Sequence, residues 1–142
     1  MATEAAPPFV IGHKVSFSKT ISADDIRKTA EASGDTNPLH LDDAYAAKTR
    51  FKQRIAHGVL TSGVISAALG VNLPGPNYTT IFLSQNLQFQ RPVAVGDTLT
   101  ANLEVTAVDR RRLTLKTDCL NQNGETVATG TADVLLDPYP RE

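Results

Sequence analysis

The sequence predicts an α+β fold, in which an antiparallel sheet of about five strands wraps around one long apolar helix. The first observation is a stretch from Val59 to Gly70 without any charged residue, which is typical of a helix buried on all sides. The second is a change to alternating polar and apolar residues over most of the chain after Asn77. Consecutive strands with short connections indicate an antiparallel meander, and such a sheet packs on a helix through one face.

Length and composition limit the function. The chain has 142 residues and a net charge of −1, from 14 Lys and Arg against 15 Asp and Glu. We expect a single domain over residues 1–142, with residues 1–9 a loose N-terminal arm. The charge argues against nucleic-acid binding. Cys119 is the only cysteine, which favours a reducing compartment. There is no membrane-length apolar run and no secretory signal pattern, so we expect a cytoplasmic protein without a membrane partner.

The first strand and helix follow from local spacing. Residues 14–21 alternate well enough to form a strand. Ser22 is then a candidate helix N-cap, and Asp25, three residues later, can complete a capping box. An apolar face at helical spacing follows, and Gly34 is a natural helix end.

A turn, a short helix and a basic loop come next. Residues 35–38 read Asp-Thr-Asn-Pro, and Pro38 forces the residue before it out of the helical region. A short helix can start at residues 42–43, with acidic groups at its positive end. Residues 49–56 form a basic loop that carries Arg50, Lys52 and Arg54.

The long apolar helix is expected from His57 and Gly58 to Gly70, about 21 Å at 1.5 Å per residue. Residues 72–77 are a loop by their Pro and Gly content. Four strands follow, at residues 81–89, 98–107, 112–119 and 125–136, with a turn at residues 121–124. In the first of them, the apolar residues Ile81, Leu83, Leu87 and Phe89 should share one face.

Asp35 and His40 are the first candidates for chemistry. A carboxylate and an imidazole beside one dry pocket can hold a water molecule and move its protons in either direction. The alternative is that Asp35 only forms a turn and His40 only caps a helix. Gly58 is the second candidate, because a backbone N–H at a helix start lacks an intrahelical partner and can polarise a carbonyl oxygen. The alternative is that Gly58 simply allows tight packing.

These residues carry a family resemblance. Asp35-x-Asn37-Pro38-x-His40, a basic loop, and Ala-His-Gly leading into an apolar helix are similar to the MaoC-like hydratase family. Within it, the chain most resembles the short (R)-specific enoyl-CoA hydratases that feed polyhydroxyalkanoate synthesis. The resemblance extends over residues 10–136. It implies a hot dog fold and a homodimer with the site at the dimer interface. It needs no metal and no redox cofactor.

The resemblance also assigns roles. It implies that Asp35 and His40 are the catalytic pair and that the Gly58 N–H belongs to an oxyanion hole. Asn37 belongs to the same motif and is a candidate substrate-binding residue, and Ser66 and Leu69 fall where such enzymes line the acyl pocket. The expected reaction is addition of water to a trans-2-enoyl-CoA thioester, giving the (R)-3-hydroxyacyl thioester. The basic residues of the loop, Arg50, Lys52 and Arg54, are either solvated or contact the CoA phosphates.

Three alternatives stay open. The same chemistry can act on substrates attached to acyl-carrier protein, as a (3R)-hydroxyacyl-ACP dehydratase of fatty-acid synthesis. A non-catalytic acyl-CoA-binding subunit is a second alternative, and a thioesterase on the same fold is a third.

His13 and His57 show no metal-ligand spacing with each other or with Asp35, so His57 is expected to be structural. Cys119 lies in an apolar strand pattern and is expected to be an inert core thiol.

Overall fold

The computed structural model describes residues 6–139 and has the predicted α+β architecture. The helices cluster between the first and second strands of the sequence, and the remaining strands follow one another. In chain order the elements are β1 (Lys14–Thr20), α1 (Ala23–Ser33), α2 (Pro38–Leu41), α3 (Asp43–Ala47), α4 (Gly58–Ala67), the π-helical turn η1 (Ala68–Asn72), β2 (Tyr78–Phe89), β3 (Thr98–Asp109), β4 (Arg112–Leu120) and β5 (Thr126–Pro138).

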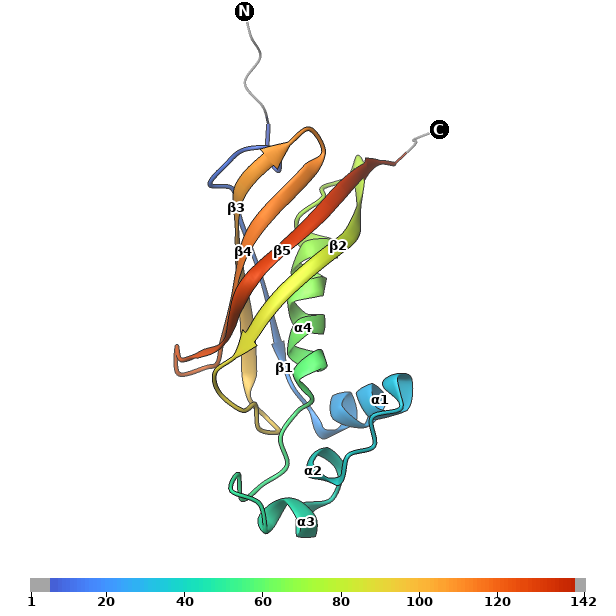
Figure 1. The fold of residues 1–142 in the computed structure, drawn as a ribbon, viewed down its shortest axis with the longest axis vertical. Helices are drawn as coiled ribbons and strands as arrows, with labels where there is room; N and C mark the ends of the chain where they lie inside the picture. The colour runs from blue at the N-terminus through green and yellow to red at the C-terminus, as the bar shows by residue number, and fades with distance from the viewer. Residues whose placement is uncertain (1–5, 140–142) are drawn as a thin grey trace, which may run out of the picture.

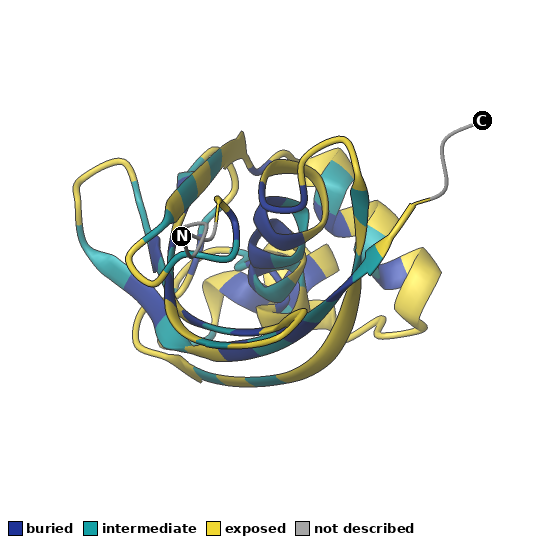
Figure 2. Cartoon of the chain, turned by 90° about the horizontal axis from the view of Figure 1, so that it is seen from above, coloured by how far each residue is buried: buried dark blue, intermediate teal, exposed yellow. Residues whose placement is uncertain are grey.

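One antiparallel sheet contains all five strands, in the order β1-β3-β4-β5-β2. The sheet curves around α4, which lies along its concave side, whereas α1, α2 and α3 gather beyond the end of the sheet where α4 begins (Figure 1). The view along the helix shows the strands partly enclosing α4 (Figure 2). The predicted fold class is therefore confirmed, and the helix that was inferred from an absence of charge occupies the centre.

The predicted meander is only partly correct. Strands β3, β4 and β5 form it, but β2 pairs with β5 at the far edge and not with its successor β3. The stretch from 90 to 97 is therefore a crossover and not a hairpin. It is anchored to the segments beside it, because Ala56 N–H donates to Val93 O at 2.7 Å and Ile21 N–H donates to Asp97 O at 2.8 Å. Periodicity identified each strand but contains no information on which edge a strand joins.

The expected apolar face of β2 is also different. The register with β5 shifts between Phe82 and Ser84, and such an irregularity interrupts strict alternation. Leu87 is half-buried and packs against the core, whereas Ile81, Leu83 and Phe89 are exposed by 42%, 44% and 54%. The edge strand thus presents large apolar side chains to the outside of the single chain.

The core lies between α4 with η1 and the concave face of the sheet. Val64, Ile65 and Leu69 are buried there, and each such side chain contributes about 1.5–3 kcal/mol on burial. The expectation of a helix buried on all sides is wrong for the single chain. Val59 is 60% exposed and Gly63 is exposed as well, because the sheet covers only one side of the helix.

The segment before β1 and the end of the central helix also differ from the expected residue ranges. Residues 1–5 of the expected loose arm lie outside the described range, but Phe9 packs edge-on against the Tyr78 ring with centroids 5.1 Å apart. Helical structure begins at Gly58 and continues through η1 to Asn72, two residues beyond the expected end at Gly70. No helix within residues 6–139 is long and apolar enough to cross a membrane.

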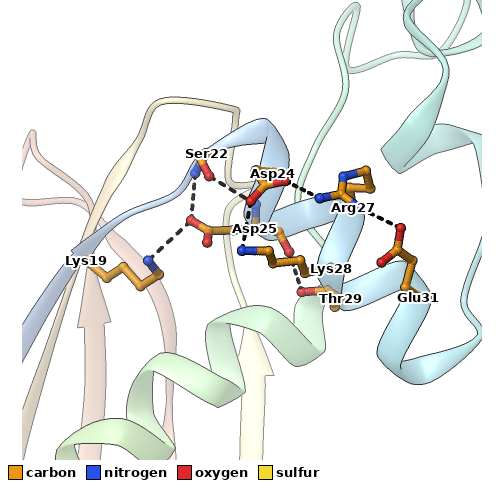
Figure 3. A network of polar contacts seen from close by, with 8 residues as sticks. All are labelled: Lys19, Ser22, Asp24, Asp25, Arg27, Lys28, Thr29 and Glu31. Carbon is orange, nitrogen blue, oxygen red and sulfur yellow. Dashed lines mark hydrogen bonds and ion pairs between the residues drawn. The ribbon is translucent and has the colours of Figure 1, made fainter.

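Helix α1 has the capping box that the sequence predicted (Figure 3). Asp25 N–H donates to Ser22 Oγ at 3.0 Å, and Ser22 N–H donates to the Asp25 carboxylate at 2.9 Å. The second bond is the main cause of a lowered pKa for Asp25. At the other end Gly34 adopts a left-handed conformation with φ of 81°, which glycine accepts without a steric penalty. The helix therefore ends immediately before the candidate catalytic turn.

Candidate active site

The turn after α1 is built from side chains that bond to nearby backbone. The Asp35 carboxylate accepts the Asn37 N–H at 3.2 Å, and Asn37 Oδ1 accepts the Leu39 N–H at 3.1 Å. Pro38 then occupies the first turn of α2, where a missing N–H costs nothing. Asn37 is therefore the N-cap of α2, and its side chain shapes the loop that presents Asp35 and His40.

His40 is the better-fixed member of the predicted catalytic pair. Its side chain is buried, and its Nδ1 lies 2.6 Å from the backbone oxygen of Ile55. A carbonyl oxygen can only accept, so Nδ1 carries the hydrogen and Nε2 is the ring nitrogen left for chemistry. Asp35, by contrast, lies on an exposed part of the loop.

His57 joins the pair, which sequence spacing did not reveal. The His40 and His57 rings stack with centroids 3.9 Å apart at 30°. One carboxylate oxygen of Asp35 and one ring nitrogen from each histidine lie within 4.8 Å of one another. The expectation that His57 shows no metal-ligand spacing with Asp35 is therefore wrong, because the ligand atoms of the two side chains lie close together. One nitrogen of each ring is already engaged by a backbone oxygen, His40 Nδ1 by Ile55 and His57 Nε2 by Asp35.

The separation within this cluster fits a bridging water. A water molecule makes hydrogen bonds of about 2.7–3.0 Å, so two partners within 4.8 Å can both contact one water. One partner, His40, lines a cavity of about 320 Å³, which also contacts Gly58, Thr61 and Phe89. The arrangement can thus hold a water next to a space large enough for part of a substrate.

Gly58 is the first residue of α4 and also lines this cavity. Within residues 6–139 no hydrogen bond is found at its N–H, and the helix N-terminus has no side-chain cap. A free N–H at the positive end of a helix dipole is suited to a carbonyl oxygen that gains negative charge. The Phe89 ring packs over Gly58, because a Cβ at this position would lie 3.1 Å from the ring. Sequence reasoning missed Phe89, because it comes from a distant strand.

The three basic loop residues do not act alike. Arg50 lines the cavity and its guanidinium lies 4.7 Å from the centroid of the Phe51 ring. Arg54 donates from Nε to the Asp43 carboxylate at 2.7 Å. Lys52 is exposed and has a positive φ of 62°. Arg91, which the sequence reading had not selected, also lines the cavity.

The two residues expected at the acyl pocket lie further along the helix. Leu69 is 1% exposed within the core, and its backbone oxygen accepts a hydrogen bond from Thr80 Oγ1 at 2.6 Å. Ser66 is half-buried. Neither lines the cavity beside His40. Cys119 is buried as expected, and burial raises the pKa of its thiol to about 11, which keeps the thiol protonated and inert.

Comparison with known proteins places this geometry in context. Residues 8–127 match the model of the MaoC like domain. The chain is 45% identical over 127 residues to an (R)-specific enoyl-CoA hydratase of Rhodospirillum rubrum, covering 88% of this chain and 86% of that protein. It is 44% identical over 116 residues to a 3-hydroxybutyryl-CoA dehydratase of Methylorubrum extorquens, covering 80% and 72% of the two chains.

The fold agrees with solved structures as well. An (R)-hydratase of Aeromonas caviae involved in PHA biosynthesis superposes with a TM-score of 0.84 at 42% identity, covering 92% of this chain and 98% of that one. The five-stranded sheet around α4 is a hot dog fold. Family model, sequence identity and fold agree, and the chain therefore belongs to the MaoC-like domain family.

Proposed function

We propose that this protein is a hydro-lyase that adds water to trans-2-enoyl-CoA and forms (R)-3-hydroxyacyl-CoA. The observation that carries the proposal is the approach of an Asp35 carboxylate oxygen and a His40 ring nitrogen within 4.8 Å, with His40 and Gly58 lining one cavity. The names of the similar proteins, (R)-specific enoyl-CoA hydratase and 3-hydroxybutyryl-CoA dehydratase, support the same reaction class.

The mechanism assigns one water to the catalytic pair. Asp35 and His40 hold it, and one of them removes a proton as the water oxygen forms a bond to C3. The π electrons of the C2–C3 bond move towards the thioester, and the oxygen that gains charge is stabilised by the Gly58 N–H. The other catalytic group delivers a proton to C2. Atoms and charge balance without any further reactant.

Substrate contacts follow from the cavity and its surroundings. Arg50 at the cavity is our candidate for the CoA phosphates, together with Lys52 and Arg54 of the same loop. Arg54 can contribute only by giving up or sharing its bond with Asp43. We assign the acyl chain to the face of the helix that carries Ser66 and Leu69. A cytoplasmic location suits a CoA thioester substrate.

We also propose that two copies associate through β2 and α4. In the single chain, large apolar side chains are exposed on the edge strand and along the helix: Val59, Val71, Ile81, Phe82, Leu83 and Phe89. An unpaired edge strand with apolar side chains needs cover in a stable protein. Light scattering at micromolar concentration should report a homodimer, and a result of monomer alone would contradict this part of the proposal.

Crotonyl-CoA is the substrate for the decisive experiment. Hydration removes the conjugated double bond, so the absorbance of the enoyl thioester should fall when the protein is added. Chiral analysis of the product should give the (R)-3-hydroxy thioester. No change in absorbance, with a folded dimer present, would leave the role of a non-catalytic acyl-CoA-binding subunit and would overturn the proposed reaction.

Acyl-carrier protein is the alternative substrate carrier. Two arginines, Arg50 and Arg91, line the cavity, although Arg91 is also paired with Glu125 at 3.2 Å. Basic residues at a cavity suit an acidic carrier protein as well as CoA phosphates. The comparison of kcat/KM for crotonyl-CoA and crotonyl-ACP separates the two, and we expect the CoA thioester to be the better substrate.

A further inference from the structure

His57 is a buried polar residue that the proposed mechanism does not use. Its side chain is 1% exposed, and its Nε2 lies 2.9 Å from the backbone oxygen of Asp35. Its Nδ1 is also buried and has no hydrogen-bond partner within residues 6–139. Most buried polar atoms in folded proteins are paired, so an exception calls for an explanation.

The bond to Asp35 determines the form of the ring. A carbonyl oxygen accepts and cannot donate, so Nε2 must carry the hydrogen. In the neutral ring Nδ1 then carries a lone pair, which is enclosed by protein and has no donor. His57 is therefore fixed as an Nε2–H donor, which is not the arrangement of a group that exchanges protons with a substrate.

The position of His57 links the three parts of the site. It is the N-cap residue of α4, so it immediately precedes Gly58. Its ring stacks on His40 with centroids 3.9 Å apart, and its Nε2–H reaches the loop that carries Asp35. One side chain thus contacts both members of the catalytic pair and is covalently adjacent to the N–H assigned to the oxyanion.

The Asp35 loop has few other restraints. Asp35 is exposed, and apart from the bond with His57 its described hydrogen bonds are short-range, from its own N–H to Ser33 Oγ at 3.1 Å and from Asn37 N–H to its carboxylate at 3.2 Å. These bonds shape the turn but do not fix it relative to α4. The bond from His57 Nε2 spans 22 residues of sequence and supplies that restraint.

We propose that His57 is a positioning residue, whose Nε2–H holds the Asp35 backbone at the start of α4 while its ring supports His40. The inference rests on the proposed hydration reaction, because it assigns Asp35 and His40 their roles there. A displacement of about 1 Å in a catalytic group can lower a rate about 10²-fold. The hydrogen bond is the dominant contribution, and the ring stack is secondary.

Two substitutions separate the hydrogen bond from the ring. His57→Phe keeps an aromatic ring against His40 but removes the donor. His57→Gln removes the ring but places an amide N–H near the former Nε2. We expect His57→Phe to lower kcat about 10–100-fold, in line with a small displacement of a catalytic group, with KM within about twofold. His57→Gln should recover most of that loss, and His13→Gln, outside the site, should behave as the wild type.

Two kinetic outcomes would contradict the proposal. Wild-type kcat in His57→Phe would overturn the proposal, and so would equal losses in the two variants at equal folded fraction, since the donor would then be irrelevant. A purely structural role would lower Tm and the folded fraction without this split between kcat and KM.

Nuclear magnetic resonance tests the same claim without activity. In the wild-type protein the ¹⁵N shifts of His57 should show a protonated Nε2 and a bare Nδ1. The amide of Thr36 shares a peptide group with the Asp35 carbonyl, so its signal should move in His57→Phe and return in His57→Gln. A wild-type His57 protonated on Nδ1 and not on Nε2 would overturn the proposal even if neither variant folds. If crotonyl-CoA is not hydrated while these signals behave as expected, the proposed function fails and the positioning contact stands.

Discussion

The sheet and the catalytic segment are held together in different ways. In the sheet each strand is paired along its length, and its inward side chains contribute to one shared core with α4. The segment from 33 to 57 has two short helices and is exposed along most of its length. Its geometry depends on single contacts, such as His40 to the Ile55 oxygen and His57 to the Asp35 oxygen.

This difference separates stability from activity. Burial in the sheet is distributed over many residues, so its contributions add up to the stability of the fold. Contacts in the catalytic segment are few, so the loss of one displaces a reactive group without unfolding the core. Changes in the segment should therefore affect rate first, and changes in the sheet should affect stability first.

The largest expected effect comes from the catalytic pair. Asp35→Asn and His40→Gln should each lower kcat by about 10²–10⁴, the usual contribution of a positioned acid or base. The double variant should be little worse than either single variant, because groups that share one water act as a unit. Steady-state kinetics with crotonyl-CoA measures all three proteins.

Stability should distinguish the two single variants. Asp35 is exposed, so Asp35→Asn should change Tm little. His40 is buried and bonded to Ile55, so His40→Gln should lower stability by about 1–3 kcal/mol. Near-normal kcat in either single variant would refute the assignment, and fully multiplicative losses in the double variant would refute the shared water.

Leu69 should affect both stability and activity, since it is a core residue and also a proposed acyl contact. Leu69→Ala should destabilise the protein by about 2–5 kcal/mol through the cavity it leaves. It should also shift preference towards longer acyl chains. Denaturant unfolding and kcat/KM for short and medium enoyl-CoAs measure the two effects. Ser66→Ala is the control for stability, and an unchanged chain-length profile in Leu69→Ala would place the acyl pocket elsewhere.

Gly130 tests the pairing of β5 with β2. It lies in β5 opposite Leu87, and a Cβ at this position would overlap the backbone oxygen of Asn86. Gly130→Ala must therefore push β2 away from β5, and we expect a loss of about 3 kcal/mol, at the upper end for overpacking. Because β2 also carries Phe89, which packs over Gly58, stability should fall more strongly than the kcat of the folded fraction. Gly63→Ala is the control for the added methyl group itself, because nothing outside the neighbouring helix backbone lies within 4 Å of its Cβ position in the single chain.

Local patterns explain what the sequence predicts well. The capping box of α1 and the Asp-Thr-Asn-Pro turn depend on residues within four positions of one another, and both are present. Asp35 and His40 share one short motif, which is why both could be selected as a pair. The alternating segments gave the strands because burial on one face imposes a period of two.

Contacts between distant segments explain the failures. The pairing of β2 with β5, the approach of Phe89 to Gly58, and the contacts of His57 with Asp35 and His40 all join residues far apart in sequence. The exposed side of α4 was missed for a related reason. An apolar stretch predicts burial but does not say whether the cover comes from the same chain.

The smallest expected effect is at the helix cap that precedes the catalytic segment. Ser22→Ala removes the oxygen that accepts the Asp25 N–H and should cost about 1 kcal/mol.

Asp25→Ala removes the reciprocal bond, and its effect should depend on pH. The pKa of Asp25 is lowered in the folded protein, so its carboxylate stabilises the fold above its usual pKa and loses this effect as the pH falls through the folded value. The difference in unfolding free energy between the wild type and Asp25→Ala should therefore be largest at neutral pH and shrink below about pH 4. A difference independent of pH would show that the charge of Asp25 is irrelevant. A lower kcat of the folded protein would show that α1 also positions the catalytic turn.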